Sequence, residues 1–377
     1  MHSMKDVVKW GICADGSRDC SAAMQTLFDQ GGDIHIPAGR YRIGRTLLLG
    51  SRTAIHADPG AVFLLDEQTP KREGDHLLSC RDGSHRIGIF GGVWDGNFAL
   101  PYNTKPASIF EPDGWSGAAL NFVGVTDLTL EDMEIANSVT YNLRLSRVED
   151  FRIRHIAFSA RERAFNQDGV HLGGGCRHGH IEDIRAVSKG QTNDDLLAIN
   201  ADDSVERIEN RGLVRDAIED IYVDGLFAED CHTAIRVLSV DAPIRRVHIR
   251  NVTAGCRCNA LNLDAARYCA TPLFTDEERP GGVGVVEDVS IENFTYWATG
   301  GALESPLMIV ESLSDRLELA GIKRDRQRDA FPQRAALSIG KVSRREVMLV
   351  GEDTRLLTPD QRIRCEEDFA SLRIDRI

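Results

Sequence analysis

Aromatic residues are scarce in this chain of 377 residues, at 6% of the sequence, whereas glycine is abundant at 34 residues. Long hydrophobic runs are also missing, and no segment approaches the roughly 18 apolar residues of a membrane-spanning helix. The first ten residues contain neither the apolar core nor the small-residue cleavage site of a signal peptide. We therefore expect a cytoplasmic protein, or a secreted one if a leader has been removed, without a membrane partner.

A disulfide pattern is missing too, because the nine cysteines are odd in number and irregularly spaced.

The formal net charge of −13 repels nucleic-acid phosphates, which excludes nucleic acid as a natural partner. Gly173-Gly174-Gly175 is not followed by the Lys-Ser/Thr pair of a phosphate-binding loop. Cys176, His178 and His180 fall short of the four ligands of a zinc site. We therefore expect no cofactor and no metal.

Short runs of alternating apolar and polar residues recur through the middle of the chain. Each run can bury one face of a β-strand. Their starts are 23 to 39 residues apart, a spacing typical of the coils of a solenoid. A propeller would need evenly spaced four-strand blades and a sandwich would need hairpin turns, and neither signal is evident. The runs cover residues 128–135, 151–158, 181–187, 218–224, 247–252 and 286–294.

The sequence therefore predicts an all-β protein, a single-stranded right-handed parallel β-helix in one domain. Residues 1–33 would form an N-terminal cap, 34–312 the coils and 313–377 a C-terminal extension. In the cap, an amphipathic helix over 21–30, with Asp19 as its N-cap residue, would cover the open apolar end of the solenoid. In the extension we expect a charged loop over 313–335, strand structure over 336–349 and a terminal helix over 360–372.

Three polar segments follow one another at about the spacing of one coil. They are Asn166-Gln167-Asp168-Gly169-Val170-His171, Asn193-Asp194-Asp195, and Cys231-His232-Thr233, which precedes a short apolar strand. Asp168 and Asp194 are 26 residues apart, and stacked strands lie about 4.8 Å from each other. We therefore expect Asp168, Asp194 and Asp195 to converge on one patch of the solenoid wall.

Clustered carboxylates repel one another, so one of the three aspartates should have a raised pKa and keep its proton near neutral pH. Glycoside hydrolysis needs that combination, because one carboxyl gives a proton to the leaving oxygen while an ionised one activates water or attacks the sugar. Two other interpretations remain open from the residues alone. Several ionised oxygens could bind Ca²⁺, and Asn-Asp-Asp is also an ordinary turn sequence.

The three segments together resemble the family 28 glycoside hydrolases, the polygalacturonase family, whose fold belongs to the pectate-lyase-like β-helices. The resemblance extends upstream to 87–97 and 135–143 and covers about residues 8–300. It implies an inverting hydrolysis of pectin-type or related plant oligosaccharides, with the carboxyls far enough apart to hold a water. It implies Asp194 as the general acid, Asp168 and Asp195 as the groups that activate water, and His232 as a residue that tunes the acid.

The chain departs from this family where a basic pair would hold the substrate carboxylate. Asn262-Leu263-Asp264 stands at that position, and an acid there would repel a uronate, which indicates a substrate other than galacturonan. Arg236 could supply the charge instead, as could Arg257 or Arg267. The candidate substrate-binding residues are Asn166, His171, Arg236, Asn262, Asp264 and Trp115.

Two rival functions remain. One is a polysaccharide lyase or epimerase on the same fold, and the other is a non-catalytic solenoid that binds carbohydrate. The sequence does not indicate whether the protein is a monomer or an oligomer.

Overall fold

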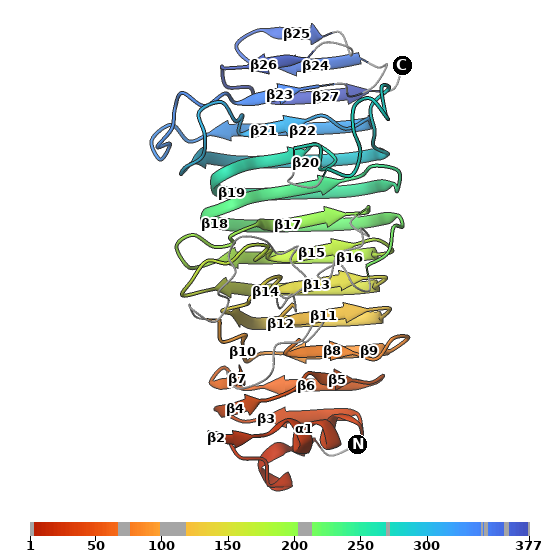
Figure 1. The fold of residues 1–377 in the computed structure, drawn as a ribbon, viewed down its shortest axis with the longest axis vertical. Coiled ribbons are helices and arrows are strands. Elements are labelled where there is room, and N and C mark those ends of the chain that lie inside the picture. Colours follow the sequence, from red (N-terminus) through yellow and green to blue (C-terminus); the bar gives the residue numbers. More distant parts are fainter. Residues whose placement is uncertain are drawn as a thin grey trace.

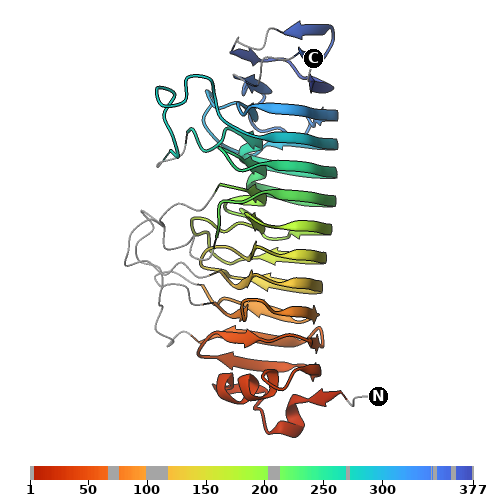
Figure 2. The same ribbon diagram turned by 90° about the vertical axis from the view of Figure 1, so that its right-hand side faces the viewer.

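The computed structural model describes residues 4–66, 76–98, 118–202, 213–268, 272–340, 342, 346–357 and 362–375. Its strands stack as successive coils along one axis, from the N-terminal to the C-terminal end (Figure 1). Figure 2 shows the same stack from the side, with the strands as the steps of a ladder. The strands of neighbouring coils pair in parallel. The chain is therefore a right-handed parallel β-helix, as the sequence predicts.

Each coil contributes strands to three faces. The first face holds β1 (Lys5–Asp6), β3 (Gly32–Ile36), β6 (Thr53–Ala57), β9 (His85–Phe90) and the first parts of β12 (Thr126–Ala136), β14 (Glu149–Ser159), β16 (Arg177–Ala186), β18 (Ile218–Leu238), β19 (Ile244–Leu263), β20 (Val286–Ala298) and β22 (Ser314–Arg324). The second face holds β2 (Asp15–Asp19), β4 (Gly39–Ile43), β7 (Ala61–Leu65), β10 (Val93–Asp95) and the second parts of the long strands.

The third face, here called the groove face, is made of short strands and carries the residues of interest. It holds β5 (Leu47–Leu49), β8 (Leu78–Cys80), β11 (Leu120–Val123), β13 (Leu143–Ser146), β15 (Val170–Gly173), β17 (Asp195–Asn200), the last parts of β18 and β19, β21 (Met308–Val310) and β23 (Leu337–Ile339). Polar side chains on this face are therefore stacked at the spacing of one coil.

The long strands bend between the first and second faces at a residue with left-handed backbone geometry. The register stacks these bends, since Asp132 and His155 lie between paired residues of β12 and β14. Among residues with a side chain, Asp, Asn and His accept positive φ most readily. The recurring apolar–charged–Asp/Asn–apolar motif therefore marks a bend within a strand. The bends are at Asp132 (58°), His155 (53°), Asp183 (50°), Gly225 (89°), Asn251 (61°), Asn293 (56°) and Gly321 (63°).

Apolar side chains at equivalent positions of successive coils stack directly above one another in the interior. Tyr41, Phe63 and Trp94 are register partners in β4, β7 and β10. Their rings stack with centroid distances of 5.8 and 3.9 Å. One continuous core results, and it runs from Val7 to Ile374. Within the described ranges the cysteines are all free, in agreement with the absence of a disulfide pattern.

The predicted N-terminal helix is present as α1 (Ser21–Phe28), which follows the 3₁₀ helix η1 (Val7–Trp10). Met24, Leu27 and Phe28 are buried in the core. The helix α1 lies at the N-terminal end of the stack (Figure 1). Cys20 is the N-cap residue, but the Asp19 side chain accepts the Ser21 N–H at 2.8 Å and so satisfies one of the first free amides. In the described part of the chain, no helix has the length and apolar character to cross a membrane.

The prediction of a charged loop over 313–335 is wrong for its first part, which forms β22. Leu317 and Leu319 alternate with outward-facing charged residues and are buried, and the many charges obscured this period of two. β22 and β23 pair in parallel with β20 and β21, so the coils extend past residue 312. The predicted strand structure over 336–349 is confirmed by β23 and by β24 (Glu346–Val350).

The predicted terminal helix over 360–372 is also wrong in its described residues. They form β26 (Ile363–Cys365) and the start of β27 (Ser371–Asp375), which pair antiparallel with β23 and β22. Leu372 and Ile374 alternate inward and are buried, which suits a strand and not a helix. Together with β24 and β25 (Thr354–Leu357) these strands lie at the C-terminal end of the stack (Figure 1).

Candidate active site

The three predicted aspartates lie together on the groove face. Asp195 begins β17, Asp194 directly precedes it, and Asp168 stands just before the neighbouring strand β15. The Gly169 N–H donates to the Asp195 carbonyl at 2.8 Å, so Asp168 stands level with Asp195 and not with Asp194. A β-carbon on Gly169 would lie 2.4 Å from the Leu196 carbonyl oxygen. Only glycine lets the two coils approach here.

The carboxyl groups are close and differ in their access to solvent. One oxygen of each aspartate lies within 4.8 Å of the other two. Asp168 and Asp195 are 3% and 4% exposed, whereas the Asp194 side chain is 29% exposed. Buried His171 holds Asp168 through a 2.6 Å contact between Nδ1 and Oδ2, and the Tyr141 ring packs edge-on against the imidazole. Asp194 is therefore the carboxyl with most access to the groove.

Burial is the main reason why the pKa of Asp195 is raised well above its ordinary value. Repulsion from the charges of Asp194 and Asp168 raises that pKa further, and the positive charges of Arg236 and His232 oppose the shift. Asp195 Oδ1 is buried and has no hydrogen-bond partner within the described part of the chain. The cluster thus retains a proton at pH values where an ordinary aspartate is ionised.

His232 supplies a positive charge beside the aspartates. Its Nδ1 lies 3.5 Å from Asp194 Oδ1, and its backbone N–H donates to the Thr192 carbonyl at 2.8 Å. Burial lowers the pKa of His232, but hydrogen bonds to Asp194 and to the Cys258 thiol outweigh that effect and raise it to about 11. The imidazole is therefore protonated at neutral pH and keeps a cation next to Asp194.

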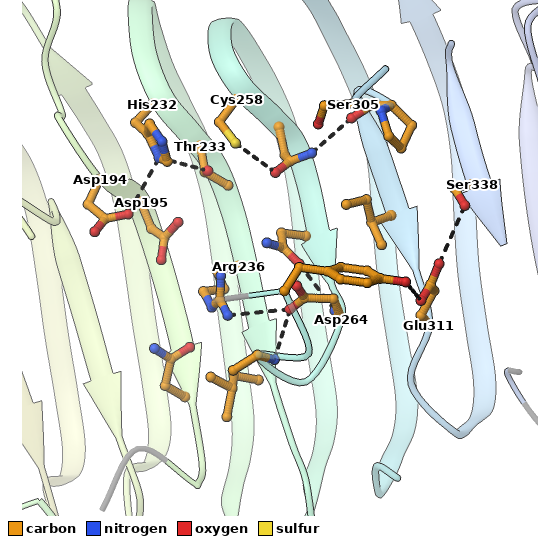
Figure 3. A pocket seen from close by; sticks show the side chains of 18 of the residues that line it. Asp194, Asp195, His232, Thr233, Arg236, Cys258, Asp264, Ser305, Glu311 and Ser338 are labelled. Carbon is orange, nitrogen blue, oxygen red and sulfur yellow. Dashed lines mark hydrogen bonds and ion pairs between the residues drawn. The ribbon is translucent and has the colours of Figure 1, made fainter. Parts of the chain in front are cut away.

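A groove of about 670 Å³ opens over the aspartates and continues toward the C-terminal end (Figure 3). All but one of the predicted catalytic residues and candidate substrate-binding residues line it, and the exception, Trp115, lies outside the described residues. The residues brought together are Asp168, Asp194, Asp195, His232, Asn166, His171, Arg236, Asn262 and Asp264.

Among the three arginines considered as carboxylate ligands, only Arg236 lines the groove. Its guanidinium lies 3.3 Å from Asp264 Oδ1, so the acid that replaces a basic residue already has a cationic partner. Arg257 donates to Asn193 Oδ1 at 2.7 Å and pairs with Asp230. Arg267 pairs with Glu311. The latter two arginines therefore brace the walls of the groove.

The sequence matches no protein-family model and no curated protein. Among solved structures, the exopolygalacturonase of Thermotoga maritima is 15% identical with a TM-score of 0.56, and the match covers 97% of this chain and 96% of that one. The family 28 exopolygalacturonase of Yersinia enterocolitica is 16% identical (TM-score 0.54, 86% and 72% covered). The surface protein and adhesin PfbA of Streptococcus pneumoniae is 12% identical (TM-score 0.57, 90% and 89% covered). These neighbours share the β-helix fold.

Sequence reasoning missed several residues of this β-helix groove. Cys258 lies beside His232, and Tyr268, Glu311 and Ser338 line the C-terminal part. Extending the ladder register would have found Ser338, which stands in one column with Arg236 and Asn262. Tyr268 lies in a turn after β19, where no periodicity points to it.

The three aspartates also meet a first requirement for a cation site. Ca²⁺ binds oxygens at about 2.3–2.6 Å, so ligand oxygens up to roughly 5 Å apart can share one ion. The aspartate oxygens, within 4.8 Å of one another, satisfy that spacing. Calcium prefers several more oxygen ligands, however, and ionised carboxylates, whereas the raised pKa of Asp195 favours its protonated form.

Asp195→Asn is expected to stabilise the fold increasingly as the pH rises. The unfolded chain loses the Asp195 proton at its ordinary pKa, and the folded chain loses it only at higher pH. The favourable contribution of the protonated carboxyl is thus complete below the unfolded pKa and is lost as pH rises through the folded pKa. Asparagine cannot ionise, so the variant should gain up to about 1.4 kcal/mol per pH unit in that window. Urea unfolding of both proteins from pH 4 to 8 measures this difference, and a pH-independent difference would contradict it.

Proposed function

We propose that this protein is a glycoside hydrolase that cleaves O-glycosidic bonds in pectin-type or related plant oligosaccharides by aspartate acid–base chemistry. The observation that carries the proposal is the groove with three carboxyls, of which Asp195 is buried with a raised pKa and Asp194 faces solvent. The sequence motifs of family 28 support it. So does the fold shared with two proteins described as exopolygalacturonases.

In this proposal the aspartates share one proton, which burial places on Asp195 in the free protein and which passes to Asp194 before the glycosidic bond breaks, so that Asp168 and Asp195 are then both ionised. Asp194, which has the best access to the groove, gives that proton to the glycosidic oxygen as the bond to the anomeric carbon breaks. Asp168 and Asp195 accept a proton from the water whose oxygen attacks that carbon. The two steps release both sugar fragments and return one proton to the cluster. His232, protonated beside Asp194, stabilises the carboxylate that forms there.

The carboxyl spacing bears on the stereochemistry. Inverting enzymes usually separate their carboxyls by about 6.5–9.5 Å and retaining enzymes by about 5–5.5 Å. Here one oxygen of each aspartate lies within 4.8 Å of one oxygen of each of the other two. A water that makes two hydrogen bonds of about 2.8 Å can still bridge oxygens at this distance. We therefore propose inversion with a water that is bound by the aspartates, and not one that fills a wide gap.

The test is a screen of aryl glycosides and plant oligosaccharides, with the first-formed anomer read by ¹H NMR. We expect release of a reducing sugar with inverted configuration. A retained product would reject the water-attack mechanism but keep the enzyme class. An absence of hydrolysis with every glycoside would reject the enzyme class and favour a carbohydrate-binding solenoid.

A calcium-dependent lyase is the second candidate, because the clustered carboxylate oxygens have a spacing that one cation could bridge. A lyase forms an unsaturated product that absorbs in the ultraviolet. Such a product, lost after treatment with a chelator and restored by calcium, would favour this candidate. Hydrolysis that persists in the chelator would exclude it.

A further inference from the structure

The groove continues well beyond the aspartates on their C-terminal side. On the groove face, β17, β18, β19 and β21 are successive steps. Three steps of about 4.8 Å place Glu311, which follows β21, about 14 Å along the axis from Asp195. Figure 3 shows Asp194 at one end of this stretch and Glu311 toward the other, with Asp264 between them. A bound oligosaccharide that runs along the axis would therefore meet both regions.

Tyr268 is an exposed aromatic side chain that lines this part of the groove. It is 56% exposed, and its hydroxyl donates to Glu311 Oε2 at 2.6 Å. Burial of the hydroxyl, together with the bond to Glu311, raises the Tyr268 pKa to about 12, so the phenol keeps the proton that it donates. The Tyr268 ring is thus open to solvent, while its hydroxyl is held in place by Glu311.

The anchor of Tyr268 is itself rigid. Glu311 is 3% exposed, and its Oε2 also lies 3.2 Å from the Arg267 guanidinium. Arg267 donates in addition to the Glu311 carbonyl at 3.0 Å and packs over the Phe274 ring. An aromatic surface held in place before a ligand arrives loses little conformational entropy on binding.

The charged residues that line this part of the groove disfavour an anionic sugar. Arg236 is paired with Asp264, and the rim arginines Arg362 and Arg364 are paired with Asp276 and Glu366 at 3.4 and 2.8 Å. In the described part of the groove, every lining arginine thus has a carboxylate partner. Glu304 also lines the groove, whereas the charges of Asp264 and Glu311 are offset by Arg236 and Arg267. A uronate would bring another negative charge into this setting.

We propose, on the basis of the glycosidase function above, that an uncharged glycosyl residue stacks on the Tyr268 ring in a subsite on the C-terminal side of the aspartates. The apolar face of a pyranose ring covers the aromatic face, and its hydroxyls donate to the neighbouring carboxylates. Asp264 acts as the residue that disfavours a uronate in this subsite.

Binding can be measured without turnover in the Asp194→Asn protein. The probes are neutral plant oligosaccharides and oligogalacturonides, each of the latter with its methyl-esterified form, studied by isothermal titration calorimetry. We expect the tightest binder to be uncharged, and each methyl ester to bind more tightly than its acid. Asp264→Asn should narrow the difference between ester and acid. A uronate as the tightest binder, or no binding by any probe, would overturn the proposal.

Variants at position 268 test the stacking contact. Tyr268→Ala should weaken binding of the tightest neutral probe about tenfold, and in the active protein it should raise KM with little change in kcat. Tyr268→Phe keeps the ring and should stay within about threefold of the unsubstituted protein. Tyr222→Ala is the control, because Tyr222 is also exposed but does not line this groove. Equal affinity of the Tyr268→Ala and unsubstituted proteins would reject the proposed stacking of the sugar on Tyr268.

These results separate the two proposals. Tight neutral binding that depends on Tyr268, without hydrolysis by the unsubstituted protein, would reject the glycosidase and keep the binding subsite. Hydrolysis that prefers a uronate, or that is unaffected by Tyr268→Ala, would keep the glycosidase and reject the subsite.

Discussion

Asp194→Asn is expected to lower kcat for glycoside hydrolysis about 10²–10⁴-fold, the usual contribution of a general acid. Asparagine has nearly the same shape and keeps a side-chain carbonyl near His232, but it has no proton to give to the leaving oxygen. Initial rates of reducing-sugar release measure the effect. Circular dichroism and thermal unfolding should change little, because the Asp194 side chain is partly exposed.

The leaving group provides a sharper form of this test. Aryl glycosides that release an acidic nitrophenol need little proton donation, so Asp194→Asn should lose much less activity on them than on oligosaccharides. Asp183→Asn is the matched control, since Asp183 is a partly exposed bend residue outside the groove and asparagine accepts its backbone geometry. Equal losses on both substrates would assign Asp194 a role other than the acid. Full activity of the Asp194→Asn variant would contradict the proposed mechanism.

Arg334→Met is expected to lower the free energy of unfolding by about 3 kcal/mol or more. Arg334 is 0% exposed, and its guanidinium donates to backbone carbonyls that methionine cannot satisfy. Each buried acceptor left without a donor costs about 1–3 kcal/mol. The carbonyls belong to Ser305, Arg257, Gly300 and Cys258. Because Cys258 and Ser305 line the groove, KM should rise as well.

Urea unfolding and steady-state kinetics at a temperature below the transition separate these two effects of Arg334→Met. Arg185→Met is the control, because Arg185 is exposed and pairs with Asp183 at the surface. Such pairs contribute about 0–1 kcal/mol. If Arg334→Met unfolds at the same urea concentration as the control, the buried guanidinium is not the brace that its contacts indicate.

The sequence predicts the β-helix and the aspartate cluster because both follow from short-range periodicity. Alternation identifies the strands, and a spacing near one coil brings Asp168 toward Asp195. The register could not be read with the same accuracy, since the repeat contains bends and bulges. Phe151 lies beside Gly179 and not beside Ile181, at which the repeat was aligned. The position of a residue along the axis is therefore predictable to about one coil. The residue that lies beside it in the next coil is not predictable in this way.

Other features depend on contacts between segments that are distant in sequence. Arg334 lies within the segment expected to be a charged loop, and only its contacts with residues of two earlier coils show why it is buried. Tyr268 and Glu311 are 43 positions apart and meet across a turn. No local pattern marks such pairs, because the partner of each polar group is set by the stacking of the coils.

The corner between the second face and the groove face differs from coil to coil. β12 and β13 are joined by the residues between Ala136 and Leu143, and β14 and β15 by those between Ser159 and Val170. β18 and β19 instead continue through this corner as unbroken strands, at the positions of His232 and Cys258. The bend between the first and second faces keeps one left-handed backbone conformation in the long strands from β12 to β22. Insertions and deletions beside the groove can therefore accumulate in one coil without displacing the next, which allows selectivity to evolve, or to be engineered, independently of the scaffold.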